Sequence, residues 1–439
     1  MKSIKETYDR ASWFVCAILL GGLLLAVTPL LALKESRSYL QQQKQTAIQV
    51  SDTSLLPAVF GGRGLVTRGG LTDMGLPPYY GQTGWPTAHR DSRNSDYLPF
   101  VSPSAFKIKW NALTRQGAVP GAATYFGPSE GVDGGLWQHS TRGTGFSHFH
   151  KFDPATGDAL FETAPWTGAC FTIEACLDSD PSTPDFAVGA QAPLVDVDGN
   201  VYISDFDQYW SFDKDGSLRW VVRFNDLFTP IGGPTSSFIS SIITKEGFVG
   251  GITTDCHLVL FNRSDGTLAI PVTELPCGPT TPNSPGLFAL RFMWYVDGEV
   301  YFPFRQLILE GLFGEGPPNV NTPAVDPETG RIIFVHRDAV DPDNHDAVTA
   351  VDLVDDGSGG KEAVIAWSSK LGPNSGASVA ISPDGQSVYT VDGNNTIWGF
   401  DVATGTPLFD TGGLGQAAAS PTVGPDGFIY AAGTEVLAS

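Results

Sequence analysis

Basic residues are scarce in this chain, which has 26 Lys and Arg against 47 Asp and Glu and a formal net charge of −21. A surplus of carboxylates repels polyanions, both nucleic acid and the headgroups of anionic lipids. Nucleic acid is therefore not an expected partner. Many secreted proteins are acidic in the same way, so the charge excludes partners without identifying one.

Common motifs of catalysis and cofactor attachment are also missing from the sequence. No two cysteines are adjacent, and no Cys-x-x-Cys-His haem motif occurs. No serine lies in a nucleophile-elbow context, and no phosphate-binding glycine loop is present. We therefore predict no catalytic residues and no resident organic cofactor.

Long helices are not expected outside one N-terminal stretch, because the chain has only three Met and few runs of strong helix formers. It has instead 51 Gly and 32 Pro among 27 Phe, 12 Tyr and 10 Trp. This composition is typical of an all-β protein with many turns and a large aromatic core.

The exception is residues 13–33, WFVCAILLGGLLLAVTPLLAL, which carry no charge. At about 1.5 Å per residue this stretch can cross a hydrocarbon core of about 30 Å. We predict a retained signal anchor, with residues 1–12 in the cytoplasm. The predicted location is a bacterial inner membrane, with a single pass and the rest of the chain in the periplasm. A cleavable signal peptide is the alternative, although its small-residue cleavage site is poor.

Short strands joined by Asp-Gly turns recur through the rest of the chain. A strand, a tight turn and a return strand occur at residues 190–203, 378–389 and 420–430, and a Phe-Asp-x-x-x-Gly corner occurs at residues 152–157, 261–266 and 400–405. Such a meander cannot bury both of its faces alone, so it needs copies of itself as neighbours. The spacing of these units predicts a β-propeller.

The repeated residues resemble the PQQ-like, quinoprotein-type β-propeller repeat over residues 84–439. That repeat ends in an outer-strand Trp, which is present at Trp220 and Trp367 and replaced by Phe161 and Phe409. We predict about seven four-stranded blades, with eight as the alternative. The units are expected near residues 121–163, 187–222, 236–272, 286–312, 320–368 and 375–410, followed by a closing unit.

Residues 34–83 are predicted to be a tether between the anchor and the propeller. Residues 84–95 look like the lead-in segment that precedes the first blade of PQQ-like propellers. Residues 106–110 alternate like an outer strand, and the last unit lacks one. We therefore predict that residues 106–110 complete that unit, beside a third strand at residues 435–437, and close the ring.

Four cysteines lie outside the predicted span. The most local pairing joins Cys170 to Cys176 and Cys256 to Cys277, which requires an oxidising compartment. Four free buried thiols are the alternative. In the second pair, the bond would join a blade edge to the connection that follows it.

Two sets of residues are candidate metal ligands. Asp196, Asp198, Asn200 and Asp205 resemble a hairpin-loop calcium site, although ordinary turn chemistry also accounts for them. His148 and His150 lie two residues apart, so a strand would place both imidazoles on one face, where they could bind a transition metal. A solvent-facing or pore-lining histidine pair is the alternative, and no third ligand is identifiable.

Three functional hypotheses follow. In the first, the chain is a non-catalytic scaffold that binds other envelope proteins, like the propeller lipoprotein of the outer-membrane assembly machinery, which this repeat also resembles. In the second, it is an accessory subunit of an inner-membrane complex. In the third, it is a ligand-binding protein or enzyme that uses the central channel, as a quinoprotein-like oxidoreductase or a histidine-based transferase. We favour the first two, because no catalytic set converges and fold alone does not establish function.

Overall fold

The computed structural model divides the chain into two units, residues 1–70 and 71–439. It describes residues 76–97, 108–110, 127–139, 147–165, 192–204, 208–229, 238, 240–278, 294–296, 299–301, 322–341, 345–373, 375–413 and 420–431. The predicted anchor at residues 13–33 and most of the predicted tether lie outside these ranges. Within these ranges, no helix has the length and hydropathy needed to cross a bilayer.

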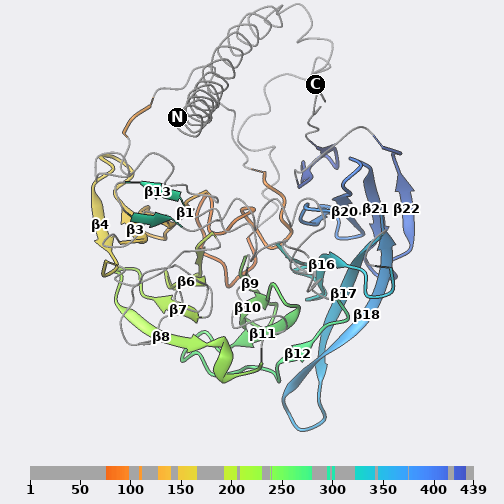
Figure 1. Cartoon of the computed structure of the whole chain (residues 1–439), viewed down its shortest axis with the longest axis horizontal. Coiled ribbons are helices and arrows are strands. Elements are labelled where there is room, and N and C mark those ends of the chain that lie inside the picture. Colours follow the sequence, from red (N-terminus) through yellow and green to blue (C-terminus); the bar gives the residue numbers. More distant parts are fainter. Residues whose placement is uncertain are drawn as a thin grey trace, which may run out of the picture. The chain divides into compact units, whose positions relative to one another are not determined.

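The second unit is built from antiparallel sheets that follow one another along the chain (Figure 1). Sheet 1 contains β1 Ser129–Glu130, β2 Leu136–His139, β3 Phe149–Phe152 and β4 Ala159–Glu162. Sheet 2 contains β5 Leu194–Val195, β6 Val201–Ser204, β7 Gln208–Phe212 and β8 Leu218–Arg223. Sheet 3 contains β9 Ile242–Ile243, β10 Val249–Ile252, β11 His257–Phe261 and β12 Thr273–Glu274.

Sheet 4 contains β15 Ala324–Val325, β16 Ile332–Arg337, β17 Asp346–Asp355 and β18 Lys361–Leu371. Sheet 5 contains β19 Ala380–Ile381, β20 Ser387–Val391, β21 Ile397–Asp401 and β22 Pro407–Asp410. Sheet 6 is described only in its first two strands, β23 Thr422–Val423 and β24 Ile429–Tyr430. A separate hairpin pairs β13 Trp294–Val296 with β14 Glu299–Tyr301, and one short 3₁₀ helix spans Phe224–Asp226.

Each four-stranded sheet is a meander whose strands pair in chain order. The turns explain the recurring Asp and Gly of the sequence. In sheet 2, Asp213 Oδ1 accepts the backbone N–H groups of Asp215 at 2.9 Å and Ser217 at 2.8 Å. Gly216 completes this turn at φ +94°, a conformation that glycine adopts without steric cost. The sequence pattern therefore fixes the hairpins locally.

Consecutive sheets pack face to face through buried apolar side chains. Trp137 and Phe149 of sheet 1 share a cluster with Trp210 and Phe212 of sheet 2. Further clusters join sheets 2 and 3, sheets 3 and 4, and sheets 4 and 5, while the first strands of sheets 5 and 6 are in contact. Serial four-stranded meanders packed in this way make a β-propeller, as predicted.

The prediction that residues 286–312 form a blade between sheets 3 and 4 is wrong. Sheets 3 and 4, which flank it in sequence, pack directly against each other, because Ile242 and Leu260 share one cluster with Val325 and Phe334. Their first strands are also in contact. The hairpin β13–β14 is therefore not a wedge between them. Its Asp-Gly pair matches the repeat in sequence, but a local pattern does not determine which sheets become neighbours.

The outer edges of several junctions are closed by an aromatic ring on a glycine of the next sheet. Trp220, Trp367 and Trp110 pack on Gly266, Gly405 and Gly157, and each indole N–H donates to the carbonyl three residues before that glycine (Arg263 at 3.3 Å, Val402 at 2.9 Å and Pro154 at 3.0 Å). Phe161 packs on Gly216 in the same way. We call each contact an aromatic latch.

Trp110 occupies on sheet 1 the position that an outer-strand aromatic residue of a preceding sheet would take. This placement agrees with the predicted closing role of residues 106–110. The pairing partners in the last unit, including residues 435–437, lie outside the described residues, so the closure itself stays a prediction.

Candidate functional site

One segment, residues 79–97, contacts the first strand of all six sheets. In every sheet the donor is the backbone N–H of the second residue of that strand. The six hydrogen bonds are Glu130 N to Trp85 O at 2.7 Å, Val195 N to Pro86 O at 2.8 Å, Ile243 N to Tyr80 Oη at 2.9 Å, Val325 N to Ser92 O at 2.6 Å, Ile381 N to Arg93 O at 2.9 Å and Val423 N to Ser95 O at 3.3 Å.

We call residues 79–97 the central segment, because equivalent atoms of six first strands all reach it. Figure 1 shows it as the orange trace between the sheets. Residues 90–95 are all buried. At the level of these hydrogen bonds, residues of the chain itself lie between the first strands. The sequence indicated a lead-in segment here, but not its central position.

Polar side chains brace the central segment from within. Asp91 Oδ1 accepts the N–H groups of Arg93 at 3.0 Å and Ser95 at 3.1 Å, and Asp91 Oδ2 lies 3.2 Å from Arg90 Nη1. Burial raises the pKa of Asp91, against the opposing effect of these donors. Asn94 Nδ2 donates to the backbone of sheets 4 and 5. The segment thus links sheets through side chains as well as carbonyls.

The two faces of the sheets differ. The connections between first and second strands, and between third and fourth strands, are tight turns, and we call their side the turn face. The second and fourth strands end on the other side of the sheets, and the third strands begin there; we call this side the loop face. The central segment lies at the turn-face ends of the first strands.

Buried polar groups gather at the loop-face ends of several sheets: His139, His148, Asp255, His257, Asp346 and Asp392. Burial, with His148 nearby, lowers the pKa of His139 to about 3. Burial raises the pKa of Asp346 to about 6, although Asp346 Oδ2 accepts the Ser375 N–H at 2.5 Å. His139 and His148 belong to sheet 1 and Asp255 and His257 to sheet 3, while Asp346 belongs to sheet 4 and Asp392 follows the second strand of sheet 5.

The predicted histidine pair is buried in sheet 1. His150 Nδ1 lies 3.4 Å from Glu162 Oε1, and its ring stacks on Phe152 at a centroid distance of 5.3 Å. His148 and His139 are both almost fully buried and interact electrostatically. Across the described part of the chain, no three His, Cys, Asp or Glu residues are grouped so as to hold a metal ion.

Protein donors contact the carboxylate of Asp196, one of the predicted calcium ligands. Asp196 Oδ1 accepts the N–H groups of Asp198 and Asn200, and Oδ2 accepts the Tyr202 hydroxyl at 2.8 Å and Arg263 Nη1 at 2.6 Å. A guanidinium at this carboxylate already supplies the positive charge that a cation would bring. Turn chemistry and an ion pair between sheets 2 and 3 account for Asp196, while Asp205 lies outside the described residues.

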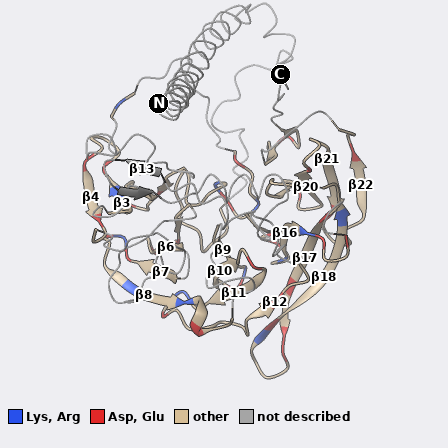
Figure 2. Cartoon of the chain, viewed as in Figure 1, with Lys and Arg blue, Asp and Glu red and all other residues tan. Residues whose placement is uncertain are grey.

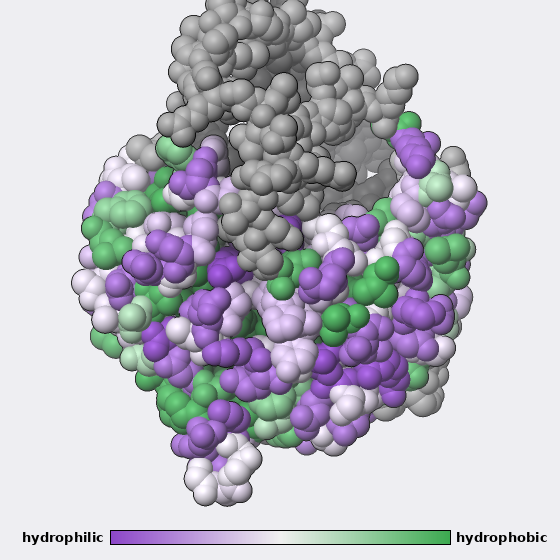
Figure 3. Space-filling view, turned by 180° about the vertical axis from the view of Figure 1, so that it is seen from behind, coloured by the Kyte–Doolittle hydropathy of each residue, from purple (hydrophilic) through white to green (hydrophobic). Residues whose placement is uncertain are grey.

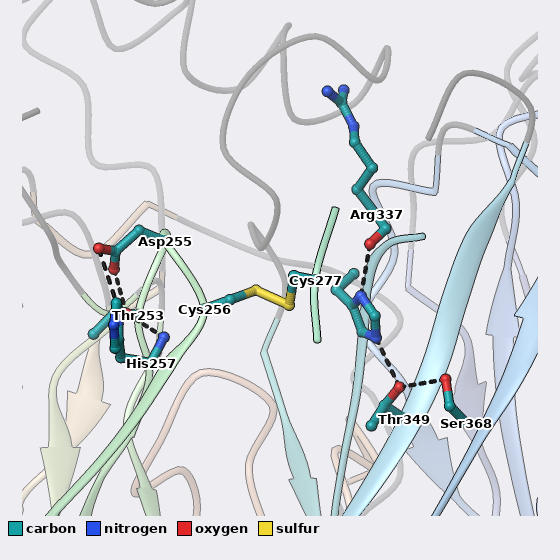
Figure 4. The surroundings of a disulfide bond; sticks show 9 residues. Thr253, Asp255, Cys256, His257, Cys277, Arg337, Thr349 and Ser368 are labelled. Atoms are coloured by element: carbon teal, nitrogen blue, oxygen red, sulfur yellow. Dashed lines mark hydrogen bonds and ion pairs between the residues drawn. A yellow bond between two sulfur atoms is a disulfide. The ribbon is translucent and has the colours of Figure 1, made fainter. Parts of the chain in front are cut away.

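The Cys256–Cys277 disulfide is confirmed, with a Cα–Cα distance of 6.2 Å. Figure 4 shows it between the Thr253–His257 turn of sheet 3 and the strand of sheet 4 that carries Arg337. Cys170 and Cys176 lie outside the described residues, so their pairing stays a prediction.

Charge and hydropathy are mixed over the surface. Figure 2 shows Asp and Glu on the turns of several sheets with Lys and Arg among them. In the view of Figure 3, hydrophilic and hydrophobic residues alternate over the described surface. Among the large apolar side chains, Val340 on the loop face is 85% exposed and Phe428 on the turn face is 66% exposed.

No family model and no curated protein matches the chain. Among solved structures, it is similar to a europium-containing methanol dehydrogenase, with 12% identity and a TM-score of 0.35 over 67% of this chain and 62% of that one. It is also similar to the quinohemoprotein alcohol dehydrogenase ADHIIG from Pseudomonas putida HK5, with 14% identity and a TM-score of 0.38 over 70% and 55%. The chain thus spans less than two thirds of either structure, and likenesses this weak carry no argument about activity.

Proposed function

We propose that this chain is a membrane-anchored, extracytoplasmic β-propeller that acts as a non-catalytic scaffold or accessory subunit of an envelope complex. The observation that carries the proposal is the central segment. Six first strands donate equivalent N–H groups to residues of this segment, so the place where a propeller commonly binds a small molecule is filled by the chain's own residues on the turn-face side.

The loop face is the proposed docking surface for a partner protein. The connections between sheets start from and return to that face, and two of them are long in sequence (residues 163–193 and 275–323), whereas the turn face consists of tight turns. Long surface loops on a rigid β scaffold commonly carry binding function. The anchor at residues 13–33 places the propeller beside other membrane proteins, which are the expected partners.

Affinity purification of the full chain in mild detergent tests this role. We expect a discrete partner at a fixed ratio to the propeller. The variant Val340→Arg, on the loop face, should lose that partner, whereas the matched variant Phe428→Arg, on the turn face, should keep it. Both residues are exposed, so both variants should melt like the parent protein. Loss of the partner in Phe428→Arg alone would contradict the proposed docking surface.

A second function is supported by the buried titratable groups at the loop-face ends of the sheets. His139, with a pKa of about 3, and Asp346, with a pKa of about 6, are the kind of perturbed groups that mark ligand or catalytic sites. A ligand-binding protein or enzyme that uses the loop-face side of the channel is therefore the alternative. A monomer that retains a small molecule in native mass spectrometry, with no protein partner, would favour it.

A further inference from the structure

The junction between sheets 3 and 4 has no aromatic latch among the described residues. The outer strand of sheet 3, β12, contains only Thr273 and Glu274, and neither is aromatic. At the junctions of sheets 1 and 2, 2 and 3, and 4 and 5, an aromatic residue of the outer strand packs on a glycine of the next sheet. Those glycines lie in turns between third and fourth strands, so the latches close junctions on the turn face, and the loop-face edge of junction 3/4 has a separate contact.

The disulfide closes that edge. Cys256 lies in the loop-face turn between β10 and β11, and Cys277 lies just beyond β12. Cys277 also forms an isolated antiparallel bridge with Asp338 of sheet 4, and the Gly278 N–H donates to Arg337 O at 2.7 Å. One covalent bond thus connects a turn of sheet 3 to a chain segment that is paired with sheet 4 (Figure 4).

We propose that the Cys256–Cys277 bond is a redox-sensitive lock on the loop-face edge of junction 3/4. The oxidised protein holds residues 277–278 against sheet 4. Reduction of the bond releases this edge, while the apolar core below it, which includes Ile242, Leu260 and Phe334, keeps the two sheets packed.

The two sulfur atoms differ in access. Cys256 is 2% exposed, whereas Cys277 is partly exposed. A dithiol reductant therefore attacks Cys277 Sγ and expels Cys256 as a thiolate, which takes up a proton. The second thiol of the reductant resolves the mixed disulfide and releases Cys277 as a thiol. One protein disulfide is reduced to two thiols, and one dithiol is oxidised to a disulfide.

Hydrogen exchange of the purified full chain, with and without dithiothreitol, tests the lock. We expect the Gly278 amide to exchange at least about tenfold faster after reduction, as is typical of local opening. The Gly266 amide, which donates to Asn262 O at 3.0 Å beside the Trp220 latch, is the control and should not change.

The double variant Cys256→Ser and Cys277→Ser separates this bond from every other disulfide. Without reductant, it should reproduce the fast exchange of Gly278, and dithiothreitol should add nothing further. Three results would overturn the proposal. They are a bond that dithiothreitol leaves intact in the folded protein, an unchanged Gly278 amide after reduction, or a loss of protection at Gly266 that is as large as at Gly278.

Discussion

The junctions on either side of sheet 3 bury apolar cores of different chemistry. Junction 2/3 is aromatic, with Tyr202, Tyr209, Trp220 and Phe261 in one buried cluster. Junction 3/4 is mainly aliphatic, with Phe334 as its one buried aromatic residue among the described ones. The first carries an indole on a glycine at its turn-face edge, whereas the second carries a disulfide at its loop-face edge.

This difference shows that two blades can pack together without the outer-strand aromatic residue that is typical of the repeat. An outer strand of six residues, β8, carries the aromatic latch to the next sheet, whereas the two residues of β12 cannot. The hairpin β17–β18 compensates in part, since Leu353 and Ala363 pack against the cluster of sheets 3 and 4. The longer hairpin thus adds apolar contacts to the junction that lacks an indole, while the disulfide fastens the loop-face edge of the same junction.

The largest expected effect comes from breaking junction 2/3. Trp220→Ala removes a side chain that is 8% exposed and its hydrogen bond to Arg263 O. Truncation of a buried Trp costs about 3–5 kcal/mol of unfolding free energy. Urea unfolding monitored by circular dichroism measures it, and Trp220→Phe should lose distinctly less. Equal losses in the two variants would show that the latch depends on the hydrogen bond and not on ring packing.

Breaking junction 3/4 should cost somewhat less. The double variant Cys256→Ser and Cys277→Ser releases a loop with a sequence separation of 21, and such a loss typically costs about 2–4 kcal/mol. Urea unfolding again measures the change. The losses from Trp220→Ala and from this double variant should add when combined, because the junctions are separate. Strong non-additivity would mean that the two junctions open as one unit.

The junction between sheets 4 and 5 provides a pH test, because Asp346 of sheet 4 accepts the N–H of Ser375, which precedes sheet 5. Burial raises the pKa of Asp346 from 3.8 to about 6, so the folded protein binds more protons than the unfolded chain between those values. The contribution of protonated Asp346 to the free energy of unfolding is therefore present below pH 4. It is lost as the pH rises to about 6, by roughly 2–3 kcal/mol at most. Asp346→Asn should remove this slope in melting experiments between pH 4 and 7. A slope unchanged in the variant would assign the titration to another group.

The smallest effect is expected at the link between the central segment and junction 2/3. Tyr80→Phe removes the oxygen that accepts the Ile243 N–H at 2.9 Å and leaves that group buried without this acceptor. The expected loss is about 1–2 kcal/mol. Thermal melting measures it, with Tyr79→Phe as the matched control, since no hydrogen bond of the Tyr79 hydroxyl contributes to this link. An equal loss in both variants would show that the hydrogen bond between Tyr80 and Ile243 does not stabilise the fold.

Much of the fold follows from the sequence, because its hairpins are fixed by local Asp and Gly chemistry. The Cys256–Cys277 pair was predictable because both residues lie close together in the sequence of one blade. The blade at residues 286–312 was mispredicted because a hairpin pattern does not specify its neighbours. The central segment was missed as a site because five of its six links to first strands are backbone carbonyls, which any residue provides, and its polar residues 87–95 show no periodicity.

The central claim is that residues 79–97 fill the space between six first strands. Hydrogen exchange of Glu130, Val195, Ile243, Val325, Ile381 and Val423 tests it most directly, because each amide donates to this segment. We predict that all six are protected together and exchange only when the propeller unfolds globally. Six amides that exchange at the rates of exposed loops, in a protein whose sheets remain protected, would contradict the account.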